Sequence, residues 1–108
     1  MQVNYLPIGT VVSLKGGDNV RVMIIGYAQM GENEPDKIYD YASVVYPQGY
    51  TQPDRLFLFD NGDIANVFAV GHMDDQQFLF GQQLDKAMKE VRGIRPEGSE
   101  EEKPEEDE

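Results

Sequence analysis

Three short stretches of this sequence contain residue types that can do chemistry. Asp60 and Asp63 bracket an Asn-Gly pair and offer oxygen ligands for calcium. Lys15 stands next to a Gly-Gly pair, as in a loop that binds phosphate, and His72 is a candidate general base. Each kind of chemistry requires partner residues at a defined spacing, so the sequence itself tests the three assignments.

The required partners are missing in all three stretches. A calcium loop of the EF-hand type needs alternating oxygen ligands and a glutamate at its twelfth position, which residues 60–63 do not provide. The lysine of a P-loop follows the glycines, whereas Lys15 precedes them. No nucleophile motif such as G-x-S-x-G supplies a partner for His72. We therefore interpret these stretches as a turn, a hairpin loop and a loop residue, and we predict no catalytic residue, no bound metal and no cofactor.

Composition and charge exclude several classes of protein. The chain has 108 residues, enough for one domain, and its net charge of -11 would repel nucleic acid and anionic membranes. It has no cysteine and one histidine, which excludes disulfides and multi-histidine metal sites. No apolar run approaches the roughly 20 residues of a membrane-spanning helix, and no secretory signal is recognisable. We expect a cytoplasmic protein that binds neither nucleic acid nor membranes.

Acidic charge is concentrated at the C-terminal end. Residues 97–108 hold eight acidic side chains and one lysine, and they include no large apolar residue. Such a segment cannot offset the entropy cost of ordering by burying surface. We predict one domain over residues 1–93 and a disordered acidic tail over residues 94–108. The tail either keeps the protein soluble or docks on a basic partner.

Hydrophobic periodicity predicts five strands followed by one helix. Alternating and β-branched segments indicate strands at residues 10–14, 20–28, 37–46, 55–59 and 64–70. The polar residues 30–36 predict a loop, and the Asn-Gly pair predicts a hairpin between the last two strands. Asp74 suits a helix N-cap, so we expect a helix over residues 75–92. The fold class is α+β, a small five-stranded, mostly antiparallel sheet or partly open barrel with one C-terminal helix.

One face of the predicted helix is apolar. Its members lie at helical spacing, namely Phe80, Leu84, Ala87, Met88 and Val91. If this stripe packs on the sheet, it is part of the core. If it does not, the stripe is itself a surface for a partner.

Aromatic residues supply the candidate binding surface. Tyr39 and Tyr41 share one face of the third predicted strand, and they point outward if the opposite face packs on the core. The alternative is that both pack under the helix as ordinary core. The apolar residues 78–80 cannot all face one side of a helix, so one of them, most simply Leu79, is expected to be exposed. The predicted partner-binding residues are Tyr39, Tyr41, Tyr50, Phe78 and Leu79.

Several short segments occur in a particular order and spacing over residues 6–80. They are LPIGTVV at 6–12, LKGG at 14–17, MIIGY at 23–27, YDY at 39–41, YPQGY at 46–50, FLF at 57–59, IANV at 64–67, and Gly71 followed by Asp74-Asp75. In this order and spacing they resemble a small bacterial family catalogued as domain of unknown function 4176. Members of that family occur mainly in Gram-positive bacteria, often beside genes for type VII secretion and LXG-type toxins. The resemblance implies a cytoplasmic accessory or chaperone-like partner of a secreted toxin, and not an enzyme.

Two functions from different classes remain open. The first is a binding module that holds an export substrate. The second is an immunity-type inhibitor, whose acidity would steer it toward a basic site on the toxic domain of a toxin.

Overall fold

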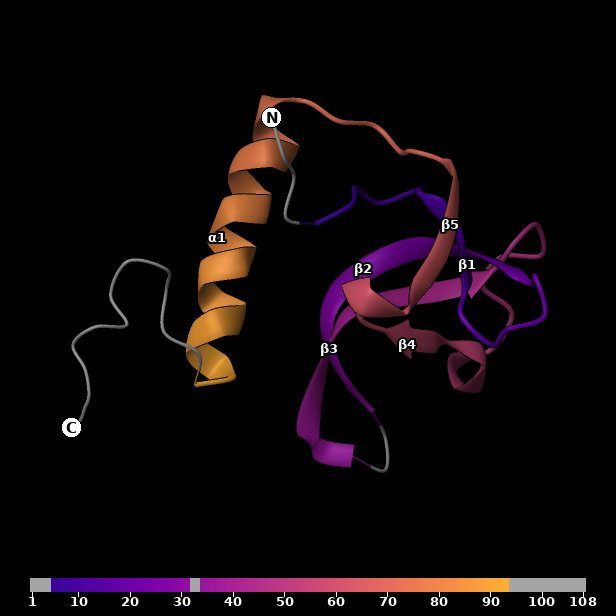
Figure 1. The fold of residues 1–108 in the computed structure, drawn as a ribbon, viewed down its shortest axis with the longest axis horizontal. Coiled ribbons are helices and arrows are strands. Elements are labelled where there is room, and N and C mark those ends of the chain that lie inside the picture. Colours follow the sequence, from indigo (N-terminus) through magenta and orange to yellow (C-terminus); the bar gives the residue numbers. More distant parts are fainter. Residues whose placement is uncertain (1–4, 32–33, 94–108) are drawn as a thin grey trace.

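The computed structural model describes residues 5–31 and 34–93, which form five strands followed by one α-helix (Figure 1). This confirms the predicted α+β class. The strands are β1 (Val11–Leu14), β2 (Arg21–Gly31), β3 (Glu34–Val45), β4 (Phe57–Phe59) and β5 (Ile64–Ala69), and the helix is α1 (Asp75–Val91). Two short 3-10 helices, η1 (Pro53–Arg55) and η2 (Asn61–Asp63), flank β4. The predicted acidic tail lies outside the described residues.

The strands form one antiparallel sheet in the order β4-β3-β2-β1-β5. The predicted hairpin between the last two strands is therefore wrong, because β4 and β5 occupy opposite edges. Asp60 and Asp63 form a reciprocal capping box that turns the Asn-Gly pair into η2. The chain then continues into β5, which pairs with β1, and the backbone N–H of Lys15 at the end of β1 donates to the carbonyl of Asp63 at 2.9 Å.

The short link between β4 and β5 requires a curled sheet. A flat sheet of this size separates its edge strands by about 19 Å, at roughly 4.8 Å per neighbour. A 3-10 segment rises only about 2 Å per residue, so η2 and its flanking residues bridge much less than that. The sheet must curl until its two edges approach each other, which agrees with the partly open barrel that the sequence suggested.

The hairpin of β2 and β3 is longer than predicted. The expected loop at residues 30–36 is mostly strand, since β2 runs to Gly31 and β3 begins at Glu34. Met30 pairs with Ile38, and a register shift follows at Gly31. The described part of this hairpin projects away from the rest of the sheet (Figure 1), and the polar side chains of Gln29 and Asp36 are exposed there. The polar composition of this segment was therefore no argument against strands.

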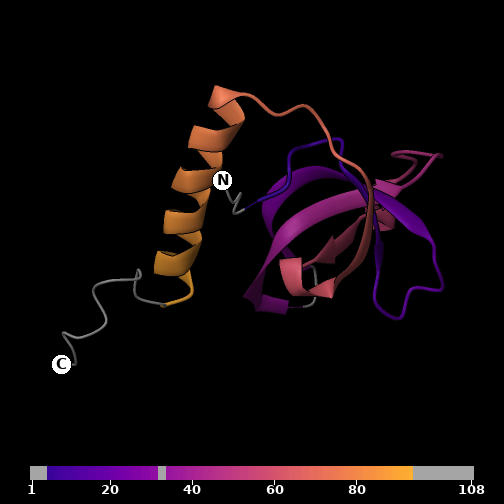
Figure 2. The same cartoon turned by 45° about the horizontal axis from the view of Figure 1, so that its top comes forward.

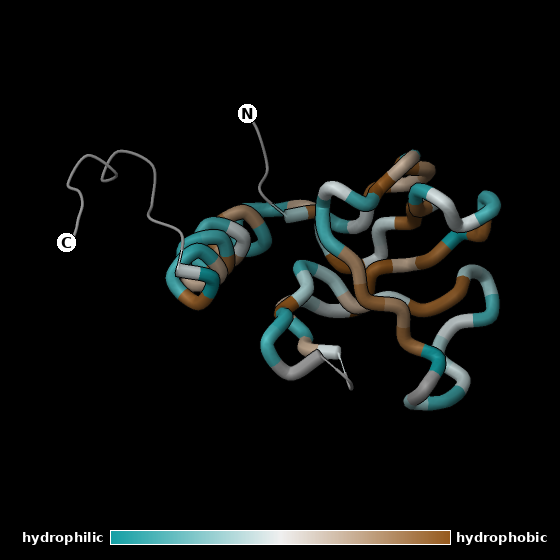
Figure 3. Tube along the Cα trace, turned by 60° about the horizontal axis from the view of Figure 1, so that its bottom comes forward, coloured by the Kyte–Doolittle hydropathy of each residue, from teal (hydrophilic) through white to brown (hydrophobic). Residues whose placement is uncertain are grey.

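The buried core lies against the inner face of the curled sheet. Its members come from the N-terminal segment, four strands and the helix: Tyr5, Val12, Val22, Ile24, Tyr41, Phe59 and Met88. Hydrophobic residues predominate along the strands, whereas they recur only at intervals along α1 (Figure 3). The sheet thus supplies most of the core, and the helix contributes a small part of it.

Helix α1 begins and ends as its sequence predicts and stands beside one end of the sheet (Figures 1 and 2). The carboxylate of Asp74 accepts a hydrogen bond from the backbone N–H of Gln77 at 2.9 Å. The helix ends before Gly93, which has a positive φ of 75°. Among the described residues, no helix combines the length and apolar character needed to cross a membrane.

Candidate functional site

Tyr41, a predicted partner-binding residue, is buried and cannot belong to an exposed surface. Its side chain is 0% exposed, and its ring lies 5.2 Å from that of Phe59 and 5.9 Å from that of Tyr27. The prediction failed because β3 lies inside the sheet and the sheet curls. Residues 40–44 are consequently buried on both faces of the strand. For Tyr41 the alternative, ordinary core, is correct.

Tyr39 and Tyr50 do not combine with the helix into one surface. Tyr39 is half-buried, with the Nζ of Lys37 4.8 Å from its ring centre. Tyr50 is 60% exposed, but it lies in the loop after Val45. Six residues of extended strand separate Tyr39 from that loop, about 20 Å at roughly 3.3 Å per residue. This loop and α1 lie at opposite ends of the sheet (Figures 1 and 2).

The start of α1 carries the remaining predicted residues. Phe78 is half-buried, and Leu79 is 56% exposed, as expected for the surplus residue of three consecutive apolar ones. Their part in binding a partner stays a prediction.

The apolar stripe of α1 is only partly covered. Leu84 and Met88 pack on the core, so the expectation that the stripe is core holds for them. Phe80 and Val91 remain 46% and 67% exposed, and Ala87 is exposed as well. The buried residues of α1 are Gly81 and Met88, so the side of the helix that faces the sheet is centred on these two residues and not on the middle of the stripe. A strip of apolar side chains is therefore left facing solvent.

Tyr27 of β2 holds the N-terminal half of α1. Its hydroxyl donates to the carbonyl of Leu6 at 2.7 Å and accepts from the Nε2 of Gln77 at 3.0 Å. The rings of Tyr27 and Phe80 lie 5.7 Å apart. One side chain therefore connects the sheet, the N-terminal segment and the helix.

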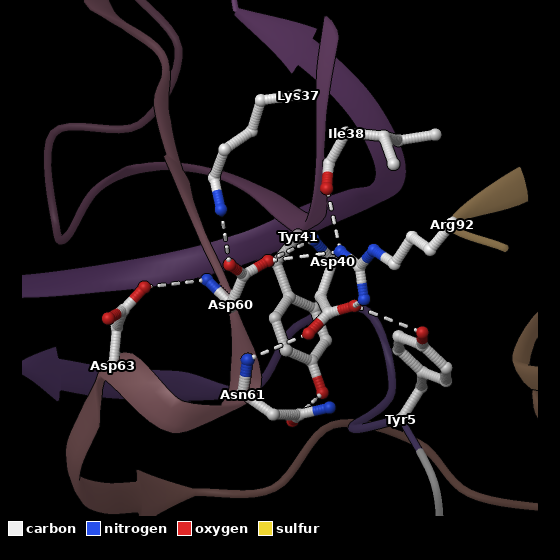
Figure 4. A network of polar contacts seen from close by, with 9 residues as sticks. All are labelled: Tyr5, Lys37, Ile38, Asp40, Tyr41, Asp60, Asn61, Asp63 and Arg92. Atoms are coloured by element: carbon white, nitrogen blue, oxygen red, sulfur yellow. Dashed lines mark hydrogen bonds and ion pairs between the residues drawn. The ribbon is translucent and has the colours of Figure 1, made fainter. Parts of the chain in front are cut away.

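Arg92 holds the C-terminal end of α1 (Figure 4). Its Nη1 lies 3.1 Å from Oδ1 of Asp40, and its Nη2 lies 3.3 Å from Oδ1 of Asp60. The same Nη2 donates to the carbonyl of Ile38 at 2.6 Å. We call Arg92 with Asp40 and Asp60 the Arg92 ion-pair cluster. It fixes the last turn of the helix to β3 and to the turn before η2.

Both carboxylates of this cluster are occupied by protein groups. Asp40 accepts from the hydroxyl of Tyr5 at 3.0 Å and from the backbone N–H of Asn61 at 2.9 Å. Asp60 accepts from the backbone N–H of Asp40 at 2.9 Å and pairs with Lys37 at 3.2 Å. A carboxylate that is satisfied in this way stabilises the fold and is badly placed to act as a general base.

The electrostatics of the core tyrosines and of Asp60 follow from these contacts. Burial raises the pKa of Tyr41 to about 12 and also raises the pKa of Tyr27. Burial and the neighbouring Asp40 raise the pKa of Tyr5. Partial burial favours the neutral form of Asp60, but hydrogen bonds from the Asp40 backbone and Lys37 outweigh it and lower the pKa. These groups keep one protonation state near neutral pH, as structural residues do.

Of the three stretches that suggested chemistry, residues 60–63 form η2 with its N-cap, Lys15 lies in a turn, and His72 lies in a loop. His72 lies in the segment before α1, where its Nε2 is 3.1 Å from Oδ2 of Asp74. Across residues 5–31 and 34–93, no group of three or more histidine, aspartate or glutamate side chains could hold a metal ion.

Sequence reasoning missed the roles of Tyr5, Tyr27 and Arg92. One signal was available, because an aspartate at position 40 in an otherwise apolar segment needs a cation or several donors. Nothing in the sequence identified Arg92 among the nine basic residues as that cation.

Comparison with known proteins gives one match. The model of the family described as "Domain of unknown function (DUF4176)" matches residues 5–80, which include the whole sheet and the start of α1. No curated protein and no solved structure matches the chain at a significant level.

Proposed function

This chain belongs to the DUF4176 family of domains of unknown function, and on that premise we propose that it is a non-enzymatic protein-binding module of the cytoplasm. In this proposal it acts as an accessory or chaperone-like partner of a protein to be exported. The exposed apolar side chains of α1 are the observation that carries the proposal.

Leu79, Phe80 and Val91 each leave about half or more of their side chain in water, and Ala87 lies between the last two. Scattered exposed apolar residues are ordinary, but a contiguous strip along one helix is typical of a surface that another protein covers. If a client covered this strip, the removal of its apolar surface from water would stabilise the complex.

The client that we propose is an LXG-type toxin of a type VII secretion system, or a component of its export complex. The support is the gene neighbourhood that the family resemblance implies. A chaperone-like partner would bind the export region of the toxin and would leave the toxic domain free.

The charge of the chain favours one alternative, an immunity-type inhibitor. A net charge of -11 would attract the protein to a basic active site and raise its rate of association. The inhibitor would bind the toxic domain of the toxin and not its export region.

The experiment that separates these functions uses the two halves of one toxin. The export region and the toxic domain of an LXG-type toxin encoded beside this chain are purified separately and titrated with it by calorimetry and size-exclusion chromatography. The proposal predicts a complex with the export region only. A complex with the toxic domain only would support the inhibitor, and binding to neither half would refute both.

A further inference from the structure

The exposed strip of α1 has the spacing of a helix-packing seam. Phe80, Leu84, Ala87 and Val91 follow one another at intervals of four, three and four residues. This is the a/d spacing by which one α-helix packs against another. We call these four residues the α1 seam. Because α1 is rotated on the sheet, only Leu84 of the seam packs on the core, and the other three members are exposed.

A second apolar wall faces the C-terminal end of the seam. Val91 and Arg92 line a surface groove of about 630 Å³ together with Met30 and Ile38 of the β2–β3 hairpin. Met30 is 62% exposed and Ile38 is half-buried. A segment that covers the seam would therefore also contact the hairpin, which gives it two apolar walls.

The charges around the groove indicate which charges a bound segment would carry beside its apolar face. Lys37 and Arg92 line the groove, but they are already paired with Asp60 and with Asp40 and Asp60, respectively. Asp36 on the groove and Glu90 beside the seam add acidic charge, and the exposed Lys86, one turn before Glu90 on the same side of the helix, offsets part of it. An occupant with basic residues beside its apolar face complements this rim.

The same charge argues against a second copy of this chain as the occupant. Two copies, each of net charge -11, repel each other, and packing seam on seam would bring their acidic flanks together.

We infer that the α1 seam and the groove beside it bind an amphipathic α-helix of the client, with apolar residues at a/d spacing and basic residues on its flanks. This inference deepens the proposed function and rests on it, because it names the segment of the partner that the binding module holds.

Single-cysteine labelling tests the location of the site. The chain has no cysteine of its own, so Ala87→Cys carries a fluorescent label on the seam, and Gln82→Cys carries the same label on the opposite side of α1. The labelled proteins are titrated with the toxin export region. The inference predicts that the label at position 87 becomes several times less accessible to iodide quenching, whereas the label at position 82 does not change.

Substitutions test which residues bind. The double variant Phe80→Ala/Val91→Asp should weaken binding of the export region by about 30-fold or more, as expected for the loss of an interface hot spot. Gln82→Ala, on the opposite side of the same helix, should bind like the wild type. Val91 is 67% exposed, but Phe80 is 46% exposed and its ring lies 5.7 Å from that of Tyr27, so the double variant should lose some stability. Circular dichroism should show that it stays folded, and Val91→Asp alone, which keeps the Tyr27 contact, should also weaken binding.

A synthetic helix tests the chemistry without the toxin. A three-heptad peptide with leucine at a and d and lysine on both flanks should bind the wild type and not the double variant. The same peptide with glutamate flanks, or with a central proline, should bind much more weakly.

The outcomes separate the inference from the proposed function. A complex with the export region that leaves the label at position 87 unchanged overturns the inference and keeps the function. Binding of the lysine peptide without any complex with the export region supports the inference and overturns the choice of client. Absence of both kinds of binding, or self-association of the free chain that protects position 87, overturns the inference.

Discussion

The guanidinium of Arg92 lies 3.1 Å from Oδ1 of Asp40, which joins the last turn of α1 to a carboxylate buried in β3. Tyr27 makes the corresponding connection near the start of the helix through Gln77 and Phe80. Between these two points, Leu84 and Met88 provide the apolar contact. The helix is therefore held at both ends, and its seam stays open along one side.

Replacing Arg92 should loosen this attachment. Arg92→Met keeps much of the apolar stem but leaves Asp40 without its cation. We expect a loss of about 1–3 kcal/mol in the free energy of unfolding. This loss is below the full cost of breaking a buried ion pair, because Arg92 is partly exposed. Lys89→Met removes the Lys89–Asp85 ion pair on the same helix and should cost no more than about 0.5 kcal/mol. Urea unfolding of the two variants measures the difference, and equal costs would contradict the role assigned to Arg92.

Alkaline pH should destabilise the fold through its core tyrosines. Burial raises the pKa of Tyr41 to about 12, so its contribution to stability is fully present below its ordinary value of 10.0 and is lost as pH rises through about 12. Tyr5 and Tyr27 have raised pKa values and act in the same direction. Spectroscopic titration of tyrosinate should show ionisation of these groups together with unfolding. Their ionisation near the ordinary value in a protein that stays folded would be the contrary result.

Two glycines should respond to alanine with opposite signs. A Cβ at Gly71 would lie 2.1 Å from the carbonyl oxygen of Ile8, so Gly71→Ala should cost about 2 kcal/mol or more, as an overpacked site does. A Cβ at Gly81 would have no atom beyond the backbone of α1 within 4 Å, so Gly81→Ala should gain up to about 1 kcal/mol from helix propensity. Thermal melts of both variants measure the signs. Stabilisation by Gly71→Ala would show that the packing of this segment on Ile8 is wrong.

Two leucines of α1, one packed on the core and one exposed, allow a matched test of how the helix packs on the sheet. Leu84 packs on the core and is half-buried, whereas Leu79 is 56% exposed. Leu84→Ala should cost about 1–3 kcal/mol, less than a fully buried leucine, and Leu79→Ala should stay within about 0.5 kcal/mol of wild type. A negligible cost at Leu84 in chemical denaturation would mean that α1 is detached from the sheet in the free protein.

The elements were predictable because their signals are local. Alternating and β-branched segments identified all five strands, and Asp74 marked the start of α1. The position of β5 was not predictable, because the capping box of Asp60 and Asp63 converts a hairpin signal into a 3-10 helix. The burial of Tyr41 was not predictable either, since it follows from the curl of the sheet.

The candidate site depends on tertiary geometry still more strongly. The sequence identifies the stripe from Phe80 to Val91, but the rotation of α1 decides which part of it is exposed. That rotation is fixed by contacts at long sequence separation, such as Arg92 with Asp40 and Gln77 with Tyr27. A pattern read along one helix contains no information about them.

The central claim is that apolar burial on α1, and not the acidic tail, binds the client. Its most direct test is calorimetric titration of the toxin export region at low and at half-molar salt. Three proteins are compared, namely the wild type, Phe80→Ala/Val91→Asp and a chain that ends before residue 97. We predict that the truncated chain binds like the wild type at each salt concentration. Half-molar salt should weaken both only modestly, since it screens the flanking charges but not the apolar contacts, and the double variant should bind about 30-fold more weakly or worse. Loss of binding on truncation and in salt, with the double variant retaining wild-type affinity, would contradict it.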